Sequence, residues 1–152
     1  MYNGNRIKDQ LDICYQNLPG SLGPEEVGTA LDTLVVRLEP DILLLGEVDS
    51  TLTRSGCPDG YTWIGGKLKG KTEKIRVSAL VKDGIKFKVM MFNSLVPAVT
   101  IQVDDWRVMG IYREWALQGN QETKGREAQL ERFVDFVSKW KSINTKRIIL
   151  GD

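Results

Sequence analysis

An apolar run between a proline and a carboxylate stands out from the hydrophobic pattern of the chain. Residues 40–47 read PDILLLGE, so four consecutive aliphatic side chains precede Gly46 and Glu47. Consecutive aliphatic positions are typical of a strand that is buried on both faces, as in the interior of a sheet. Residues 148–152, IILGD, show the same order of aliphatic run, glycine and acid. The pattern predicts two buried strands, each presenting a carboxylate at its C-terminal end.

Helical periodicity marks the segments that precede these two strands. Between 24 and 38, apolar residues recur at helical spacing after a proline and two glutamates, which suit the first turn of a helix. Residues 125–141 have the same period. We therefore expect amphipathic helices over 24–38 and roughly 125–141. The sparser apolar positions of residues 7–16 allow a third helix.

Strand-like alternation dominates the middle of the chain. The segments with this pattern are 61–64, 75–81, 85–91, 99–103 and 106–112. Lys82-Asp83-Gly84 separates two of them and predicts a hairpin. Apolar runs beside half-polar strands indicate the α/β class, with two packed sheets and helices outside them. The length suits one domain, residues 1–152.

Composition narrows the choice of chemistry. The net charge of +1 supplies no overall field toward nucleic acid or membranes, so any basic site must be local. No segment is long or apolar enough to span a membrane, and we expect no membrane partner. The chain has no histidine, which excludes imidazole as a base or ligand within it. Cys14 and Cys57 allow a disulfide without arguing for one.

Four polar residues at predicted strand ends are candidates for chemistry. Carboxylates such as Glu47 and Asp152 can hold a hard cation, for example Mg²⁺, if they converge at one edge, and Asn3 would add a neutral oxygen. Tyr112 could orient or protonate a phosphate oxygen. Simpler interpretations stay open: solvated carboxylates, a turn asparagine, and an aromatic ring that packs beside Trp115.

Basic residues at two places could neutralise phosphates. One place is the single residue Arg113. The other is a glycine-rich segment with Lys67, Lys69, Lys71, Lys74 and, just beyond it, Arg76. A solvated loop explains the lysines equally well.

Taken in order, these motifs resemble the endonuclease/exonuclease/phosphatase superfamily, a four-layered α/β sandwich of metal-dependent phosphodiesterases. Residues 1–7 resemble its opening strand, which implies that Asn3 is the active-site asparagine. Residues 40–47 resemble its PDIL-x-L-Q-E motif, which implies that Glu47 is the metal ligand. Gly46 stands where that family often has glutamine.

The later motifs extend the resemblance. Residues 76–89 are similar to the R-x-x-x-LVK-x-G hairpin, and residues 110–113 to the strand that ends in the active-site tyrosine, here Tyr112. Residues 148–152 resemble the start of ILGD-x-N, which implies that Asp152 is the catalytic aspartate. The following asparagine and the terminal Ser-Asp-His motif are missing. We therefore expect a domain that is incomplete at its C-terminus and inactive, or nearly so, by itself.

The form YREW at residues 112–115 is most similar to endonuclease domains of non-LTR retrotransposons. This resemblance implies a DNA endonuclease that uses Mg²⁺, or Mn²⁺ in its place, in an intracellular and specifically nuclear setting. It also implies a reverse transcriptase as a fused or cooperating partner. The residues expected to contact the DNA backbone are Asn5, Lys67, Lys69, Lys71, Arg76 and Arg113. Two alternatives remain: a phosphatase acting on a phospholipid, an inositol phosphate or a nucleotide, and a non-catalytic scaffold with the same fold.

Overall fold

Two mixed sheets and two helices form most of the part of the chain that the computed structural model describes, residues 10–66, 75–90, 96–112, 127–128, 130–135, 138 and 146–151. One sheet has the order β1-β2-β4-β3, from β1 (Ile13–Asn17), β2 (Ile42–Gly46), β4 (Val77–Lys82) and β3 (Tyr61–Gly65). The other has the order β5-β6-β7-β8, from β5 (Lys88–Val89), β6 (Ala98–Val103), β7 (Trp106–Ile111) and β8 (Lys146–Gly151). The helices are α1 (Pro24–Leu38) and α2 (Ser50–Ser55).

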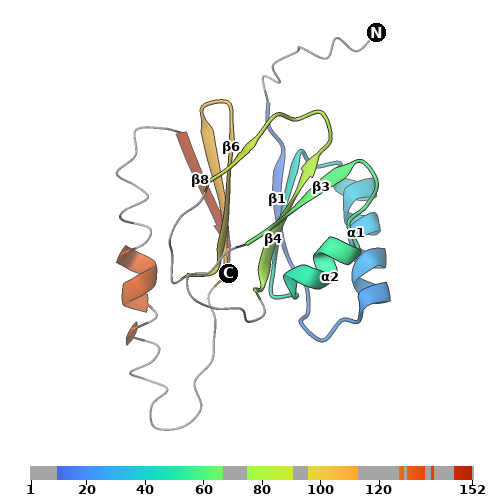
Figure 1. The fold of residues 1–152 in the computed structure, drawn as a ribbon, viewed down its shortest axis with the longest axis horizontal. Coiled ribbons are helices and arrows are strands. Elements are labelled where there is room, and N and C mark those ends of the chain that lie inside the picture. Colours follow the sequence, from blue (N-terminus) through green and yellow to red (C-terminus); the bar gives the residue numbers. More distant parts are fainter. Residues whose placement is uncertain are drawn as a thin grey trace.

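The two sheets lie face to face, and helices cover the outer side of each (Figure 1). Helices α1 and α2 lie outside the β1-β2-β4-β3 sheet, and a helical segment around residues 130–135 lies outside the other. This arrangement confirms the predicted four-layered α/β sandwich.

Strand β2 is buried on both of its faces, as the aliphatic run predicts. Leu44 faces the space between the sheets, in one apolar cluster with Ile101 of β6. Leu43 faces the opposite way, in a second cluster with Val27 and Leu31 of α1. All five residues of β2 are buried, because the strand has a sheet on one side and a helix on the other.

Helix α1 has the predicted bounds, and its ends explain why. Pro24 occupies the first turn, where its missing N–H costs nothing, and Glu26 reaches back to accept the backbone N–H of Gly23 at 2.8 Å. At the other end Glu39 is left-handed, with φ of 43°, and its N–H donates to Val35 O. Pro40 follows directly, so the chain enters β2 without a further helical turn.

The predicted hairpin between 75–81 and 85–91 is wrong. The turn itself forms, with Gly84 at φ of 91°, but the two strands on either side of it belong to different sheets. Strand β4 pairs with β2 on one side and β3 on the other, so it has no edge left for the next segment. Strand β5 therefore pairs with β6 in the opposite sheet.

The helix expected over residues 7–16 is also wrong where the structure describes it, because Ile13–Asn17 is strand β1. Leu11, Ile13 and Tyr15 recur at every second position and pack against the cluster between the sheets. Strand β1 pairs in parallel with β2. The opening strand expected at residues 1–7 lies outside the described residues.

Two other expectations have a partial outcome. The 125–141 helix is confirmed at residues 127–128, 130–135 and 138, which are helical. Strand β8 exists, but Ile148, Ile149 and Leu150 are only half-buried, whereas burial on both faces was expected. Among the described strands β8 pairs with β7 alone, so it lacks the two-sided cover of β2. Both cysteines are free thiols.

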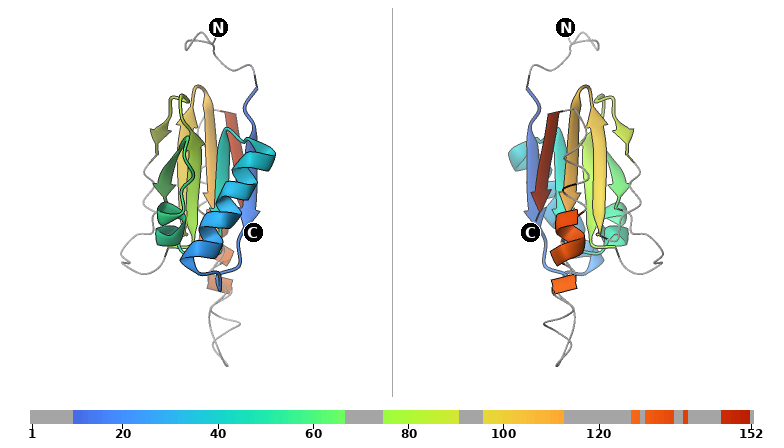
Figure 2. Two further views of the ribbon diagram at one scale, coloured as in Figure 1. Left: turned by 90° about the vertical axis from the view of Figure 1, so that its right-hand side faces the viewer. Right: turned by 90° about the vertical axis from the view of Figure 1, so that its left-hand side faces the viewer.

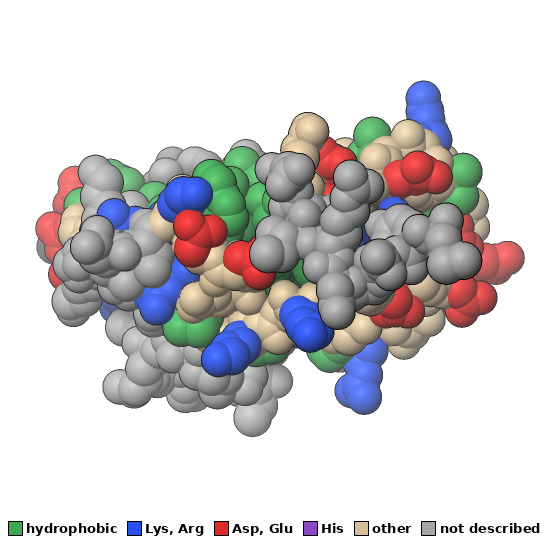
Figure 3. Space-filling model, turned by 90° about the horizontal axis from the view of Figure 1, so that it is seen from above, with side chains coloured by type: hydrophobic (Ala, Val, Ile, Leu, Met, Phe, Trp, Pro, Cys, Tyr) green, Lys and Arg blue, Asp and Glu red, His purple; other side chains and the backbone are tan. Residues whose placement is uncertain are grey.

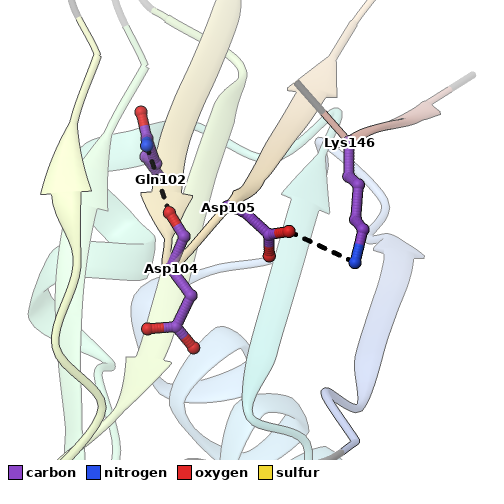
Figure 4. A network of polar contacts seen from close by, with 4 residues as sticks. All are labelled: Gln102, Asp104, Asp105 and Lys146. Atoms are coloured by element: carbon purple, nitrogen blue, oxygen red, sulfur yellow. Dashed lines mark hydrogen bonds and ion pairs between the residues drawn. The ribbon is translucent and has the colours of Figure 1, made fainter. Parts of the chain in front are cut away.

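The end of the sandwich at the β6–β7 turn has side chains of both charges (Figure 3). There Lys146 of β8 lies 3.2 Å from Asp105 (Figure 4). Its ammonium lies 5.2 Å from the centre of the Trp106 ring. Gln102 donates to the backbone oxygen of Asp104 at 3.1 Å. The Lys146 and Asp105 side chains are mostly exposed, so their ion pair adds little stability.

No helix in the described ranges is long and apolar enough to cross a membrane.

Strand β2 ends in a strained turn that aims Glu47. Glu47 has φ of 70°, a left-handed conformation that side chains disfavour. The N–H of Val48 donates to Gly46 O at 2.9 Å, a hydrogen bond that closes a three-residue γ-turn around Glu47. Such strain is stored most often at functional sites, where the surrounding structure holds it in place.

Leu44→Ala should lower the free energy of unfolding by about 2–5 kcal/mol, because it leaves a cavity between the two sheets. Val36→Ala is a matched control on α1, since Val36 is 75% exposed, and should change it by less than about 0.5 kcal/mol. Urea unfolding monitored by tryptophan fluorescence measures both. Equal losses would contradict the assignment of Leu44 to the shared core.

Glu47→Gly should be more stable than Glu47→Ala by about 1 kcal/mol, because only glycine adopts the positive φ without steric cost. Both variants lose the same carboxylate, so the comparison isolates the backbone. Urea unfolding of the two variants side by side makes the measurement. If the alanine variant proves as stable as the glycine variant, the turn at Glu47 is not strained.

Candidate active site

The carboxyl ends of four strands meet at one edge of the sandwich. Strand β1 runs parallel to β2, and β7 runs parallel to β8. The arrowheads of β1 and β8 point toward the same end of the molecule (Figure 2). Parallel strands that end together bring their C-terminal residues to a common edge, which is where α/β folds usually place their ligands.

The contact between the two sheets at this edge involves the residue after β3. The Gly66 N–H donates to Val77 O at 2.9 Å, opposite the end of β2. A side-chain carbon on Gly66 would lie 3.2 Å from Ala98 O in the other sheet. Ala98 pairs with Ile111, and Ile111 pairs with Gly151. The ends of β2, β7 and β8 are therefore neighbours.

Asn17 and Glu47 are hydrogen-bonded at this edge. Asn17 is the last residue of β1, and its Cα partner is Gly46, the last residue of β2. Its side-chain Nδ2 donates to Glu47 Oε2 at 2.8 Å, and both residues are half-buried. A donor on one oxygen of a carboxylate fixes the direction in which the carboxylate points.

Sequence reasoning missed Asn17. It assigned the asparagine role to Asn3, which lies outside the described residues. The alternation that ends in Asn17, followed by a Pro-Gly loop, a helix and the strand β2, is the signal of a strand–helix–strand unit. Because such a unit makes its strands parallel, it brings Asn17 next to the end of β2.

Arg76 supports the backbone of Glu47. Its Nη1 donates to the backbone oxygen of Glu47 at 3.1 Å, which helps hold the γ-turn in place. A side-chain carbon on Gly20 would lie 2.7 Å from this nitrogen, so the loop after β1 closes over the guanidinium. Arg76 was predicted to contact phosphate; the structure gives it a contact to the turn that carries Glu47.

Tyr112 follows β7 at the same edge. Its N–H donates to Pro97 O at 3.2 Å, and its half-buried side chain packs against the apolar cluster between the sheets. The other residues predicted for the site lie outside the described residues: Asn3, Asn5, Lys67, Lys69, Lys71, Arg113 and Asp152.

The described donors fit a hard cation with one protein carboxylate. Mg²⁺ is commonly held by one or two carboxylates, with water and substrate phosphates as its other ligands. Asn17 engages Oε2 of Glu47, so Oε1 is the oxygen that can turn toward a cation. Within the described ranges no three Cys, Asp or Glu side chains gather into a metal site, so Glu47 would need partners from elsewhere.

Comparison with known proteins finds solved structures of similar fold but no match by sequence. No family model matches the chain, and no curated protein matches its sequence. An endonuclease/exonuclease/phosphatase family protein from Bacteroides thetaiotaomicron is similar, with a TM-score of 0.61, 14% identity, and coverage of 93% of this chain and 62% of that one.

Two further solved structures are similar. D. rerio TDP2 complexed with single strand DNA product has a TM-score of 0.58 and 11% identity, over 93% of this chain and 60% of that one. The mannosyl-6-phosphatase of Bacteroides thetaiotaomicron has a TM-score of 0.62 and 12% identity, over 94% and 65%. The chain thus spans less than two thirds of each solved structure. Its described part has the fold of the endonuclease/exonuclease/phosphatase family, as the sequence motifs indicate.

Proposed function

We propose that this protein hydrolyses phosphodiester bonds of DNA as a Mg²⁺-dependent endonuclease of the retrotransposon type. The observation that carries the proposal is the Asn17–Glu47 pair, a directed carboxylate at the edge where four strands end. The fold is shared with TDP2, whose structure includes a DNA product. Fold alone does not choose among substrates, so the proposal depends on the site and on the YREW resemblance.

Glu47 would hold the metal ion through Oε1, with Mn²⁺ as a substitute for Mg²⁺. When bound, the cation would stabilise negative charge on the phosphate and on the leaving oxygen. Asn17 would keep the carboxylate in one orientation by donating to Oε2. Arg76 would limit movement of the turn, because its guanidinium is bonded to the Glu47 backbone.

The remaining roles are assigned by position. Asp152 follows β8 directly and would orient or deprotonate the attacking water. Tyr112 would donate its hydroxyl to a phosphate oxygen. Asn17 takes the asparagine role that the sequence motif gave to Asn3. Asn5, Arg113 and the lysines of the 67–74 segment would contact the DNA backbone and position it without reading its sequence. A reverse transcriptase would act with the domain or be fused to it.

Glu47→Gln should reduce Mg²⁺-dependent nicking of supercoiled plasmid by on the order of 10²–10³-fold, since it removes several kcal/mol of charge stabilisation. Gel analysis of the open-circular product, over a MgCl₂ series, measures the rate. The protein is assayed both as this chain and with the continuation encoded at its source locus.

Glu39→Gln is the matched control, because Glu39 is exposed at the C-terminal end of α1, before β2 begins, whereas Glu47 follows the end of β2. It should nick at the unsubstituted rate. Equal activity of Glu47→Gln and Glu39→Gln would contradict the assignment of Glu47. No nicking by either length of the chain would favour the phosphatase or the scaffold.

Binding to duplex DNA should weaken by at least about tenfold between 50 and 200 mM salt, because a DNA-backbone site releases counterions on binding. Fluorescence anisotropy of a labelled duplex, with Glu47→Gln to prevent cleavage, measures the affinity.

The mannosyl-6-phosphatase with the same fold makes a phosphatase the second candidate. Absence of duplex binding, together with phosphate release from an inositol phosphate or a nucleotide, would establish that alternative.

A further inference from the structure

We propose that Tyr15 is a positioning residue of this site: its hydroxyl holds the Asn17 amide so that Nδ2 faces Glu47, in a space that Gly46 leaves open. The inference rests on the proposed function and deepens it. It adds two residues, Tyr15 and Gly46, that neither the motifs nor the comparisons assign.

Tyr15 and Asn17 lie on the same side of β1. They are two residues apart in a strand, so their side chains point the same way. Their Cα partners on β2 are Leu44 and Gly46, and Leu44 faces the space between the sheets. The Tyr15 ring packs against that core, and its hydroxyl lies 3.1 Å from Asn17 Oδ1.

Two hydrogen bonds of the Asn17 side chain have opposite directions, and they orient its amide. The Tyr15 hydroxyl donates to Oδ1, whereas Nδ2 donates to Glu47 Oε2 at 2.8 Å. A flipped amide would turn Oδ1, which only accepts, toward a carboxylate that also only accepts. The Glu47 carboxylate thus sets which end of the amide faces it. The Tyr15 hydroxyl, by donating to Oδ1, restrains the amide in that position, so the three side chains form a directed chain.

Gly46 makes this chain possible by lacking a side chain. A carbon built on its Cα would overlap the Tyr15 hydroxyl oxygen and lie 2.7 Å from Asn17 Oδ1. The glycines with positive φ are Gly60 and Gly84 within the described ranges, so Gly46 is not needed for its backbone conformation. What the position requires is space.

For catalysis, these contacts would fix the position of the Glu47 carboxylate. A ligand must be held within about 0.5 Å of its productive position, and the groups behind it supply that constraint. Glu47 sits on a strained turn, so its carboxylate depends on contacts such as the one from Asn17. Loss of the Tyr15 hydroxyl should loosen the carboxylate while leaving the fold in place.

Tyr15→Phe removes one oxygen and tests the proposal. Tyr61→Phe is the matched control. The Tyr61 hydroxyl donates to Pro40 O at 2.7 Å, and Pro40 lies just before the start of β2, at the opposite end of the strand from Gly46. Burial, followed by the nearby Asp41 and Glu39, raises the pKa of Tyr61, so it stays protonated in neutral buffer as a neutral donor. Both variants lose one partly buried hydroxyl hydrogen bond.

The first readout is the pair of side-chain NH₂ signals of Asn17 in a ¹⁵N–¹H spectrum, assigned with Asn17→Ser. In Tyr15→Phe both signals should shift or broaden, and in Tyr61→Phe they should stay in place. The second readout is nicking in MgCl₂, where Tyr15→Phe should lower kcat by about 10- to 100-fold with KM within about twofold. Tyr61→Phe should keep kcat.

The outcomes separate the two proposals. Asn17 signals that do not move in Tyr15→Phe overturn the positioning role, whatever the activity. Signals that move while kcat is unchanged overturn it as well. Signals that move in a protein that never nicks DNA support the positioning of Asn17 and count against the endonuclease. Gly46→Ala gives a second approach, since its methyl group must displace the Tyr15 hydroxyl and should shift the same signals.

Discussion

The burial of β2 from both sides is the constraint on which the rest of the structure depends. Leu43 and Leu45 are covered by α1, and Ile42 and Leu44 by the second sheet. Neither cover alone would remove the strand from water. The strand therefore joins the two halves of the sandwich, and every other element is placed relative to it.

A strand buried in this way must end where polar groups can again be solvated or hydrogen-bonded, and this explains why the candidate site lies at the end of β2. Glu47 follows the last buried residue, in a turn whose strain the surrounding contacts must hold. Arg76 binds the backbone of that turn, and Asn17 binds the carboxylate. The polar edge is thus a direct extension of the apolar core, because the residues that bind Glu47 are positioned by strands that pack against β2.

The sequence and the structure differ where pairing between distant segments decides the outcome. The Lys82-Asp83-Gly84 turn was recognised, but local alternation does not reveal that both edges of β4 are already occupied. Likewise the spacing of Leu11, Ile13 and Tyr15 fits a strand only once β2 offers an edge for parallel pairing. The motif match pointed to Asn3, which lies outside the described residues, and it overlooked Asn17, which parallel pairing with β2 puts next to Glu47.

The sequence by itself determined the layers of this protein. The uninterrupted aliphatic run specified a doubly buried strand, and the helical period of residues 24–38 specified its cover, because these patterns reflect burial of each segment alone. It also singled out Glu47 as a candidate, since a carboxylate after such a run is costly to bury unless water, a cation or a donor compensates it. Only the tertiary structure decided the partners of that carboxylate. Asn17 is 30 residues away from Glu47 in the chain. Tyr15 and Gly46 come into contact only because β1 and β2 pair side by side. No local pattern encodes which side chain fills the space that a glycine leaves on a neighbouring strand.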